Sequence, residues 1–435
     1  MDLSARLSTY LAPDSVSKKR DLENSWLLLR ALGDPHKRLP PAFHVAGTNG
    51  KGSTVAMLKS IFQTAGYVVH RYTSPHLVSY NERIELGGTP ISDALLERAL
   101  ERVETAVETL RMHPSFFEVL TAAAMLVFSE HKADVLLLET GLGGRLDCTN
   151  VVEQPLVTVI TSISKDHTEY LGHTLTEIAY EKAGIIKPYV PCIISRQTPD
   201  VYHVLLEQCR SVQARAVCCD TDFWYKSEAE GMVYHATHCP PLRCPTLGLA
   251  GHHQLMNAAG AVAAVQAQHV LPVCPAHIVE GVRAVEWPGR LQKMNHRAAK
   301  QLLGTEVDVY VDGAHNDAAA ACLNRWIETS LPERPYLVLG MKRTKNPASF
   351  CKRLSAVAPW GVAVPVSGSA GYDVLELAEK ASQGRIHFTA AESLLQGLQS
   401  VVQKRGHSSS AIIVTGSLHL VGAFLELEQT ASQTL

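Results

Sequence analysis

The sequence lacks both a long hydrophobic run and an excess of charge of one sign. No apolar segment approaches the roughly 20 residues that a membrane-spanning helix needs. The first stretch, MDLSARLSTYLAPDSVSKKR, has neither the basic start nor the long apolar core of a signal peptide. With 40 Lys and Arg against 42 Asp and Glu, the formal net charge of −2 indicates neither nucleic-acid nor membrane binding. We therefore expect a cytoplasmic protein.

Cysteine pairs with metal-binding or redox spacing are also missing. The ten cysteines are scattered and none forms a C-x-x-C pair, so we expect most to be small buried hydrophobic residues. The densest group is HATHCPPLRC, with His235, His238, Cys239 and Cys244. It has no second matching pair, and its prolines predict a loop. A metal site there is therefore the weaker interpretation.

Internal repeats and low-complexity segments are absent, and the 435 residues exceed what one core usually accommodates, which predicts two domains. In the first half, buried-type runs alternate with helical patterns at 93–111, 116–131 and 174–184. This alternation predicts an α/β fold with a parallel sheet covered on both faces. The runs are AFHVAGT, YVVHRYTSP, ADVLLLETG and PLVTVITSISKDH.

A second, smaller α/β series follows WPGRLQ. We expect its strands in VDVYVDGAHN, PYLVLGM, GVAVPVS, RIHFT and AIIVTGS. The boundary is placed between Trp287 and Pro288, which divides the chain into domains 1–287 and 288–435.

The stretch HVAGTNGKGSTVAML (44–58) departs from the common phosphate-binding loop. In G-x-x-x-x-G-K-[ST] the hydroxyl directly follows the lysine, whereas here Lys51 is followed by Gly52 and the hydroxyls come late. Gly47 lies only three positions before Gly50. A strand precedes the turn and a helical pattern follows it, so backbone N–H groups and the helix start would attract phosphate. The alternative is a tight turn that only packs a helix on a sheet.

Three of the predicted strands are followed by polar residues, Ser74, Glu139 and His167. In parallel sheets ligands collect at the carboxyl ends of the strands, where the phosphate loop also lies. A carboxylate, a hydroxyl and an imidazole would form a plausible magnesium site completed by phosphate and water. Each residue alone is more often an ordinary solvated side chain.

Two further positions are ambiguous from the residues alone. Lys182 in YEKAGIIKP reads by default as an exposed helix lysine. Asp312 and His315 in VDGAHN follow a strand. The Asp312 carboxylate either accepts hydrogen bonds from a ribose or caps the next helix.

Together these segments resemble the folylpolyglutamate synthase and dihydrofolate synthase family of the Mur-ligase superfamily. The resemblance spans nearly the whole chain and depends on the order of its motifs. It implies the Mur-ligase architecture, a P-loop ATPase domain with a parallel sheet followed by a Rossmann-like domain. The motifs are HVAGTNGKGST, YTSPHL, NERI, ETGLGGRLDCTN, SISKDHTEYLG, EKAGIIK, GHHQLMNA, WPGRLQ, DGAHN and GSLHLVG.

The resemblance also implies residue roles. Ser74, Glu139 and His167 would hold Mg²⁺, and Lys182 matches a lysine that family members carry as a carbamate. The expected catalytic residues are Lys51, Lys182, His167 and Arg290. Contacts to ATP are implied for Gly47, Thr48, Asn49, Gly50, Lys51, Gly52, Ser53, Asn257, Arg290, Asp312 and His315. The pterin substrate is implied near Ser115, Phe116, Phe117 and Glu118 and near Leu146, Asp147 and Cys148.

The implied reaction is ATP-driven addition of L-glutamate to dihydropteroate or to a folate through an acyl phosphate. It requires no Ser or Cys nucleophile, and the sequence contains no triad signature. The resemblance implies small-molecule partners and a monomer. One activity alone is the nearest alternative. A non-catalytic nucleotide-binding relative is more distant, because Glu139, His167, Lys182 and Arg290 are all present.

One segment departs from the family pattern. After LGM the family commonly has a D-K-D stretch, whereas this chain has KRTKN at 342–346. The departure puts in doubt what this loop contributes to domain closure or glutamate handling. A basic loop would suit a dianionic substrate, but a solvated surface charge run is the favoured interpretation.

Overall fold

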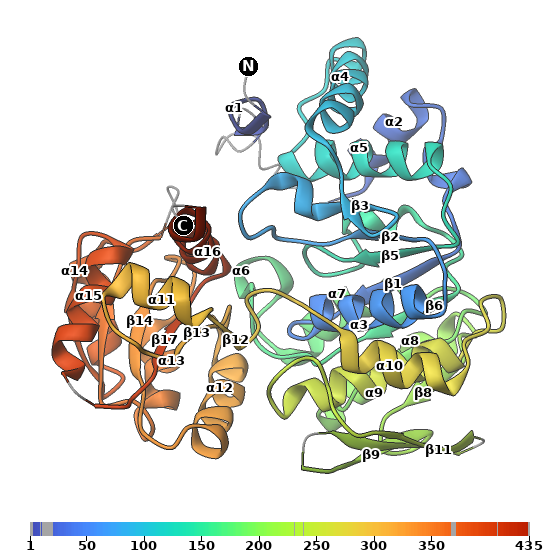
Figure 1. Ribbon diagram of the computed structural model, residues 1–435. Helices are drawn as coiled ribbons and strands as arrows, with labels where there is room; N and C mark the ends of the chain where they lie inside the picture. The colour runs from blue at the N-terminus through green and yellow to red at the C-terminus, as the bar shows by residue number, and fades with distance from the viewer. Residues whose placement is uncertain are drawn as a thin grey trace.

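Two α/β bodies, each built on its own sheet, lie side by side in the computed structural model (Figure 1). The structure describes residues 3–8, 10, 21–229, 231–237, 239–366, 371–406 and 408–433. Among these residues, no helix has the length and apolar character that crossing a membrane requires. The expected α/β fold with parallel sheets is confirmed.

The first sheet has the strand order β4-β3-β2-β5-β1-β6-β7-β8 and is parallel from β2 to β8. Its central strand β5 (Val135–Glu139) is buried at every position, because helices cover both faces of the sheet. The antiparallel strands β3 (Ile84–Leu86) and β4 (Thr89–Pro90) form the edge. The other strands are β1 (Ala42–Ala46), β2 (Val69–Tyr72), β6 (Val157–Ile160), β7 (Cys192–Ile194) and β8 (Ala216–Cys218).

Separate sets of helices cover the two faces of this sheet. On one face lie α3 (Lys51–Thr64), α9 (His253–Gln266) and α10 (Pro275–Ala284). Gly281 lets α10 approach α3 closely, since a Cβ there would lie 2.5 Å from the Ile61 Cα. On the other face lie α2 (Glu23–Ala31), α4 (Asp93–Leu110), α5 (Phe116–Glu130), α7 (Leu175–Ala183) and α8 (Pro199–Ser211). Shorter helices are α1 (Leu3–Ser8) and α6 (Thr168–Leu171), with single turns at Pro35–Arg38, Tyr80–Arg83 and Cys148–Val151.

A small antiparallel sheet follows, and it corrects one prediction. Its strands are β9 (Phe223–Ser227), β10 (Met232–Ala236) and β11 (Cys239–Cys244), in the order β11-β10-β9. The proline-containing stretch that was expected to be a loop is therefore largely strand. Its prolines are tolerated because β11 is an edge strand, where a missing N–H costs no ladder hydrogen bond. His238 lies outside the described residues.

The second body contains the strand order β12-β13-β17-β14-β15-β16. All five expected strands are confirmed. They are β13 (Val309–Val311), β14 (Tyr336–Leu339), β15 (Trp360–Ala363), β16 (His387–Ala390) and β17 (Ile412–Thr415), with β12 (Gln292–Lys293) added antiparallel at the edge. One face carries α12 (Asp317–Ser330), α13 (Pro347–Leu354) and α14 (Val374–Ser382). The other carries α11 (His296–Leu303), α15 (Leu394–Arg405) and α16 (Leu418–Gln433).

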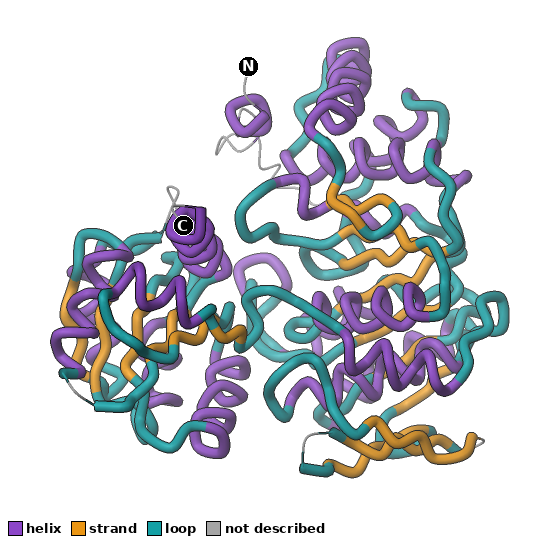
Figure 2. The backbone as a smooth tube through the Cα atoms, viewed as in Figure 1, coloured by secondary structure: helices purple, strands orange, loops and turns teal. Residues whose placement is uncertain are grey.

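The C-terminal helix α16 lies where the second body meets the first (Figure 2). Leu77, which follows β2 in the first body, packs against the hydrophobic core beneath α16. Gly422 on α16 allows a close approach, since a Cβ there would lie 1.9 Å from the Leu77 carbonyl oxygen. The two bodies are thus in direct contact at the carboxyl end of β2.

Candidate active site

The glycine turn at 47–50 joins β1 to α3 and is held tightly on both sides. Gly47 has a φ of 153°, and a Cβ there would lie 1.8 Å from the Thr161 Oγ1. Gly50 precedes α3 with a φ of 90°, and a Cβ there would lie 2.3 Å from the Asn257 Oδ1. Only glycine fits either position, because side chains are excluded by both conformation and space. The turn is thereby fixed between the end of β6 and α9.

Hydrogen bonds to the segment after β6 fix the same turn. The Thr48 N–H donates to the Ser162 carbonyl at 2.8 Å, and its hydroxyl donates to the Ser164 carbonyl at 3.0 Å. Lys51 folds back over the turn, with its Nζ 3.2 Å from the Gly47 carbonyl oxygen and 3.3 Å from that of Thr48. The lysine ammonium therefore lies above the turn, at the start of α3, where a bound phosphate would be stabilised.

Glu139 ends β5 beside this lysine. Its side chain is 5% exposed, and its Oε1 lies 4.0 Å from the Lys51 Nζ. The Ser74 N–H donates to the Oε2 at 3.4 Å, which places the loop after β2 on the same carboxylate. Burial raises the pKa of Glu139, while the charges of Lys51 and Arg290 lower it. The cost of burying the Glu139 carboxylate is therefore larger than the stabilisation that the two positive charges supply. A bound cation would offset this cost, and carboxylate oxygens are the ligands that Mg²⁺ prefers.

His167 precedes α6 in a left-handed conformation, with a φ of 50°. Burial, aided by the charge of Lys345, lowers the pKa of its imidazole to about 4. The ring is therefore neutral at pH 7, the form in which histidine binds metals. Within the described ranges, no three His, Cys, Asp or Glu side chains gather as a metal site. A metal held by Glu139, His167 and Ser74 would thus also need oxygens from phosphate or water.

Lys182 on α7 is buried, and the default expectation of an exposed helix lysine is wrong. The residue is 4% exposed, and its Nζ donates to the Gly47 carbonyl at 2.7 Å. The helix packs closely here, because a Cβ on Gly144 would lie 2.8 Å from the Lys182 carbonyl oxygen. The neighbouring Glu181 pairs instead with Arg145 at 2.7 Å. Lysines from α3 and α7 thus converge on the same carbonyl.

Asp312 lies at the end of β13 and fastens the linker between the two bodies. Its carboxylate accepts the N–H of Leu291 at 3.0 Å and that of Ala314 at 2.9 Å. The cap of α12 is Asn316, whose Oδ1 accepts the Ala319 N–H at 3.0 Å. The helix-cap interpretation of Asp312 is therefore wrong, and its contact with a ribose stays a prediction.

Polar side chains from the second body reach the phosphate loop. Asn49 and Asn316 exchange two amide hydrogen bonds, of 3.2 and 3.1 Å. Asp166 accepts hydrogen bonds from the His315 Nε2 at 3.2 Å and from the Asn316 Nδ2 at 2.9 Å. It also forms an ion pair with Lys345. The predicted ATP contacts Asn49 and His315 are thus brought together across the two bodies.

Sequence reasoning did not single out three of these residues. Asp166 and Asn316 each stand beside a histidine that was selected, inside the motifs SKDHTEYLG and DGAHN. Lys345 belongs to KRTKN, and its side chain is only 10% exposed. The interpretation of that stretch as a solvated surface run is therefore wrong for Lys345. Asp166 and Asn316 are polar residues that closely follow two predicted strands, and this position was the signal by which they could have been selected.

The two segments expected near the substrate lie together. Ser115 and Glu118 form a capping box that starts α5. The ring of Phe117 lies against Gly141, where a Cβ would lie 2.3 Å from the ring. Burial, together with the charges of Asp147 and Glu118, raises the pKa of the Cys148 thiol. Residues 115–118 and 146–148 thus share one region just beyond β5.

A buried polar network fixes the second of these segments. Asp147 accepts the Leu142 N–H at 2.8 Å and the Thr149 N–H at 3.0 Å. The Thr149 hydroxyl also contacts the His44 Nε2, at 2.8 Å, inside β1. Leu146 is half-buried beside this network. Near the other segment, the Arg83 guanidinium lies 5.3 Å from the ring centre of Phe116.

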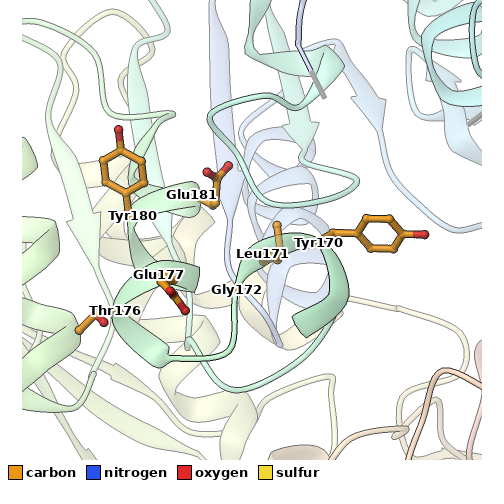
Figure 3. Close-up of a pocket in the computed structure, with 7 residues that line it drawn as sticks. All are labelled: Tyr170, Leu171, Gly172, Thr176, Glu177, Tyr180 and Glu181. Atoms are coloured by element: carbon orange, nitrogen blue, oxygen red, sulfur yellow. The ribbon is translucent and has the colours of Figure 1, made fainter. Parts of the chain in front are cut away.

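A pocket of about 490 Å³ on the surface of α6 and α7 lies outside this constellation (Figure 3). It is lined by Tyr170, Leu171, Gly172, Thr176, Glu177, Tyr180 and Glu181. Its acidic groups are already engaged, since Glu177 completes the capping box of α7 and Glu181 pairs with Arg145. The predicted site residues are not among its lining residues, so we assign the chemistry to the phosphate loop.

Comparisons with known proteins agree with this geometry. Residues 45–265 match the Mur ligase middle domain, and residues 292–427 match the dihydrofolate synthetase C-terminal domain. The chain is 34% identical over 423 residues to the dihydrofolate synthase/folylpolyglutamate synthase of Bacillus subtilis, with 91% of each protein covered.

Solved structures resemble the whole chain. E. coli FolC in complex with DHPP and ADP matches with a TM-score of 0.88 and 29% identity, covering 99% of both chains. A bifunctional folylpolyglutamate synthase/dihydrofolate synthase with Mn, AMPPNP and L-glutamate bound matches with a TM-score of 0.85 and 28% identity, over 100% of this chain and 98% of that one. The chain therefore belongs to the folylpolyglutamate synthase and dihydrofolate synthase family of the Mur ligases and is an ATP-dependent ligase that forms a carbon–nitrogen bond.

Proposed function

We propose that this ligase adds L-glutamate to two acceptors, dihydropteroate and the glutamate tail of a reduced folate. The observation that carries the proposal is the junction at the end of β5. Glu139 lies beside the phosphate-loop lysine, and Gly141, two residues later, lies against the ring of Phe117. The ring of Phe117, which could pack against a pterin-type acceptor, thus lies next to the charged site for ATP. The related structures with DHPP, with AMPPNP and with L-glutamate support the same set of substrates.

We assign phosphate binding to Lys51 and the turn at 47–50, with Arg290 as a second positive charge. Glu139, Ser74 and His167 would hold Mg²⁺, which when bound supplies charge neutralisation to the phosphates. The family relative with Mn bound supports a divalent cation. Lys182 would position the turn through its bond to the Gly47 carbonyl. Its carbamylation stays a prediction.

The reaction then proceeds in two displacements. An oxygen of the acceptor carboxylate attacks the γ-phosphorus of ATP, which gives an acyl phosphate and releases ADP. The amine of L-glutamate attacks the acyl carbon, loses a proton and expels inorganic phosphate, leaving an amide. Phosphoryl transfer depends mainly on positioning and on neutralising charge, which Lys51 and Arg290 supply in a site shared by the two bodies.

Incoming L-glutamate carries two carboxylates, and a cluster of basic groups lies where the two bodies meet. The Arg83 Nε donates to the His76 Nδ1 at 2.8 Å. Burial, and then the charges of Lys345 and Arg83, lower the pKa of Lys342. Burial and the charges of Lys342 and Arg83 lower the pKa of His419 to about 4. The charges of Lys342 and Arg83 in this largely buried cluster would be neutralised by a bound dianion, so we assign the glutamate site to it.

We also propose that the chain divides at residues 287 and 288 into a domain that binds ATP and a domain that completes the ligase site. The hydrogen bond from Leu291 to Asp312 would make the linker a hinge fixed at its second end. Figure 1 shows this segment passing between the two bodies. The monomeric state and the cytoplasmic compartment stay predictions.

Phosphate release from ATP tests the function directly. Purified protein with magnesium and L-glutamate would be assayed with 7,8-dihydropteroate and, separately, with tetrahydrofolate. We expect release with both acceptors, and mass spectrometry should identify the added glutamate. Release with one acceptor only would reduce the proposal to that activity, and release with neither would refute it. Phe117→Ala should raise the KM of the acceptor, while Phe223→Leu, in the remote small sheet, should not.

A further inference from the structure

The carboxylate of Asp166, in the first domain, contacts several polar groups of the second domain. It lies after β6 in the first domain, next to the candidate metal ligand His167. Three groups from the second domain reach it: the Lys345 ammonium, the His315 imidazole at 3.2 Å and the Asn316 amide at 2.9 Å. The side chain of Asp166 is 9% exposed and that of Lys345 is 10% exposed. This ion pair is therefore largely shielded from solvent, unlike most surface pairs.

The Asp166 carboxylate neutralises the charge of Lys345, because the loop that carries Lys345 contains no acidic residue. In KRTKN its neighbours are Thr344 and Asn346, which carry no charge. The loop is held in place by β14 before it and α13 after it, and the Tyr372 hydroxyl donates to the Lys345 carbonyl at 3.0 Å. The lysine is thus presented from a fixed backbone. Removing one partner of a shielded pair leaves the other charge poorly solvated, which is costly.

Asn316 connects the ion pair to the phosphate loop through its side-chain hydrogen bonds. Its Nδ2 donates to both Asp166 and Asn49, and its Oδ1 accepts from Asn49 and from the Ala319 N–H of α12. The orientation of α12 relative to the phosphate turn is therefore set through two side chains. Asp166 determines where one of these, Asn316, is held.

We propose that the Asp166–Lys345 ion pair is an interdomain latch that positions α12 and His315 over the phosphate loop, which makes both residues positioning residues for the ligase reaction. The proposal rests on the proposed function for its kinetic consequence. Its structural consequence, the spacing of the two domains, is independent of substrate.

A double-mutant cycle tests the latch. Lys345→Met and Asp166→Asn should each lower kcat/KM for L-glutamate about 100-fold. The double variant should be no worse than the poorer single variant, because both changes break the same pair. Lys345→Arg should retain most of the activity. ADP affinity, measured by calorimetry, should fall less than kcat/KM in Lys345→Met, because the bonds that hold the phosphate turn lie within the first domain and only the contact of His315 is displaced.

The matched control is Arg196 with Asp220, an exposed ion pair within the first domain. Arg196→Met should leave kcat/KM and the scattering profile unchanged. X-ray scattering of Lys345→Met without substrate should show a larger radius of gyration than wild type. If Lys345→Met does not fold, Lys345→Gln takes its place in the cycle.

Two outcomes would overturn the latch: additive losses in the double variant, or wild-type turnover and scattering in Lys345→Met. If the wild-type protein releases no phosphate, the proposed function fails. The scattering comparison then still decides whether the ion pair holds the domains together.

Discussion

Replacing Gly422 by alanine is expected to slow catalysis strongly without unfolding the protein. Gly422 is buried on α16 at the contact with Leu77 of the first domain. In an isolated helix the change from glycine to alanine stabilises by about 1 kcal/mol, so the helix itself should tolerate it. The added Cβ, however, would lie 1.9 Å from the Leu77 carbonyl oxygen. Because this neighbour is backbone, no side-chain rotation relieves the clash.

The size of the effect follows from the required displacement. Carbon atoms in side chains are essentially never found closer than 3.0 Å to such an atom, so α16 and the loop must separate by about 1.1 Å. Leu77 lies in the loop of residues 73–79, which begins just after β2 and contains the candidate metal ligand Ser74. A misplacement of about 1 Å in a catalytic arrangement lowers rates roughly 100-fold. We therefore expect kcat to fall about 100-fold.

Phosphate release, thermal unfolding and ADP binding would be measured on the same preparation. The unfolding midpoint should stay within a few degrees of wild type, and ADP should still bind. The control is Gly260→Ala in α9, where the nearest atom to a new Cβ is the Ser195 Oγ at 3.4 Å, an ordinary contact. That variant should keep its activity. Wild-type turnover in Gly422→Ala would show that docking of α16 on the loop is not needed for catalysis.

Two further changes test the candidate metal site and the buried His44. Glu139→Gln removes the buried carboxylate beside Lys51, and turnover should fall about 10²–10³-fold, with a weaker dependence on magnesium in a titration of phosphate release. An unchanged magnesium titration would exclude Glu139 as a ligand. Burial lowers the pKa of His44 to about 3, so between pH 6.5 and 3 the unfolded chain binds a proton that the folded chain does not. The free energy of unfolding should therefore fall by about 1.4 kcal/mol per pH unit below 6.5 on account of this residue. Denaturant titrations at pH 7 and pH 5 should show a smaller difference in His44→Gln, and an equal difference would contradict the assignment.

The strands and the glycine turn could be predicted because their signals are local. Continuous apolar runs such as VLLLE occur where a strand is covered on both faces, and the spacing of apolar residues after the turn marks α3. The order of motifs then indicated the family, since a series of short segments in fixed order is far more specific than any one of them.

The environment of individual charged residues could not be predicted in the same way. Lys182 and Lys345 both look like surface lysines in the sequence, yet one donates to the Gly47 carbonyl and the other pairs with Asp166 in the other domain. Their partners lie more than a hundred positions away, so no periodicity carries the information. The prolines of β11 were misleading for a related reason, because only the sheet order shows that this strand lies at an edge.

The shortened phosphate loop has a structural cause and a consequence. The turn is fixed between Thr161 and Asn257, and the hydroxyls that follow the lysine late, those of Ser53 and Thr54, fall in the buried first turn of α3. The hydroxyl residue that contacts Glu139 is instead Ser74, through its backbone N–H, and it lies on the loop of residues 73–79. In an ordinary P-loop the lysine and the metal ligand share one rigid segment. Here they are separated, and the loop with the hydroxyl is the one that contacts α16. The position of the second domain therefore bears directly on the candidate metal site, which links the completion of the ligase site to the docking of that domain.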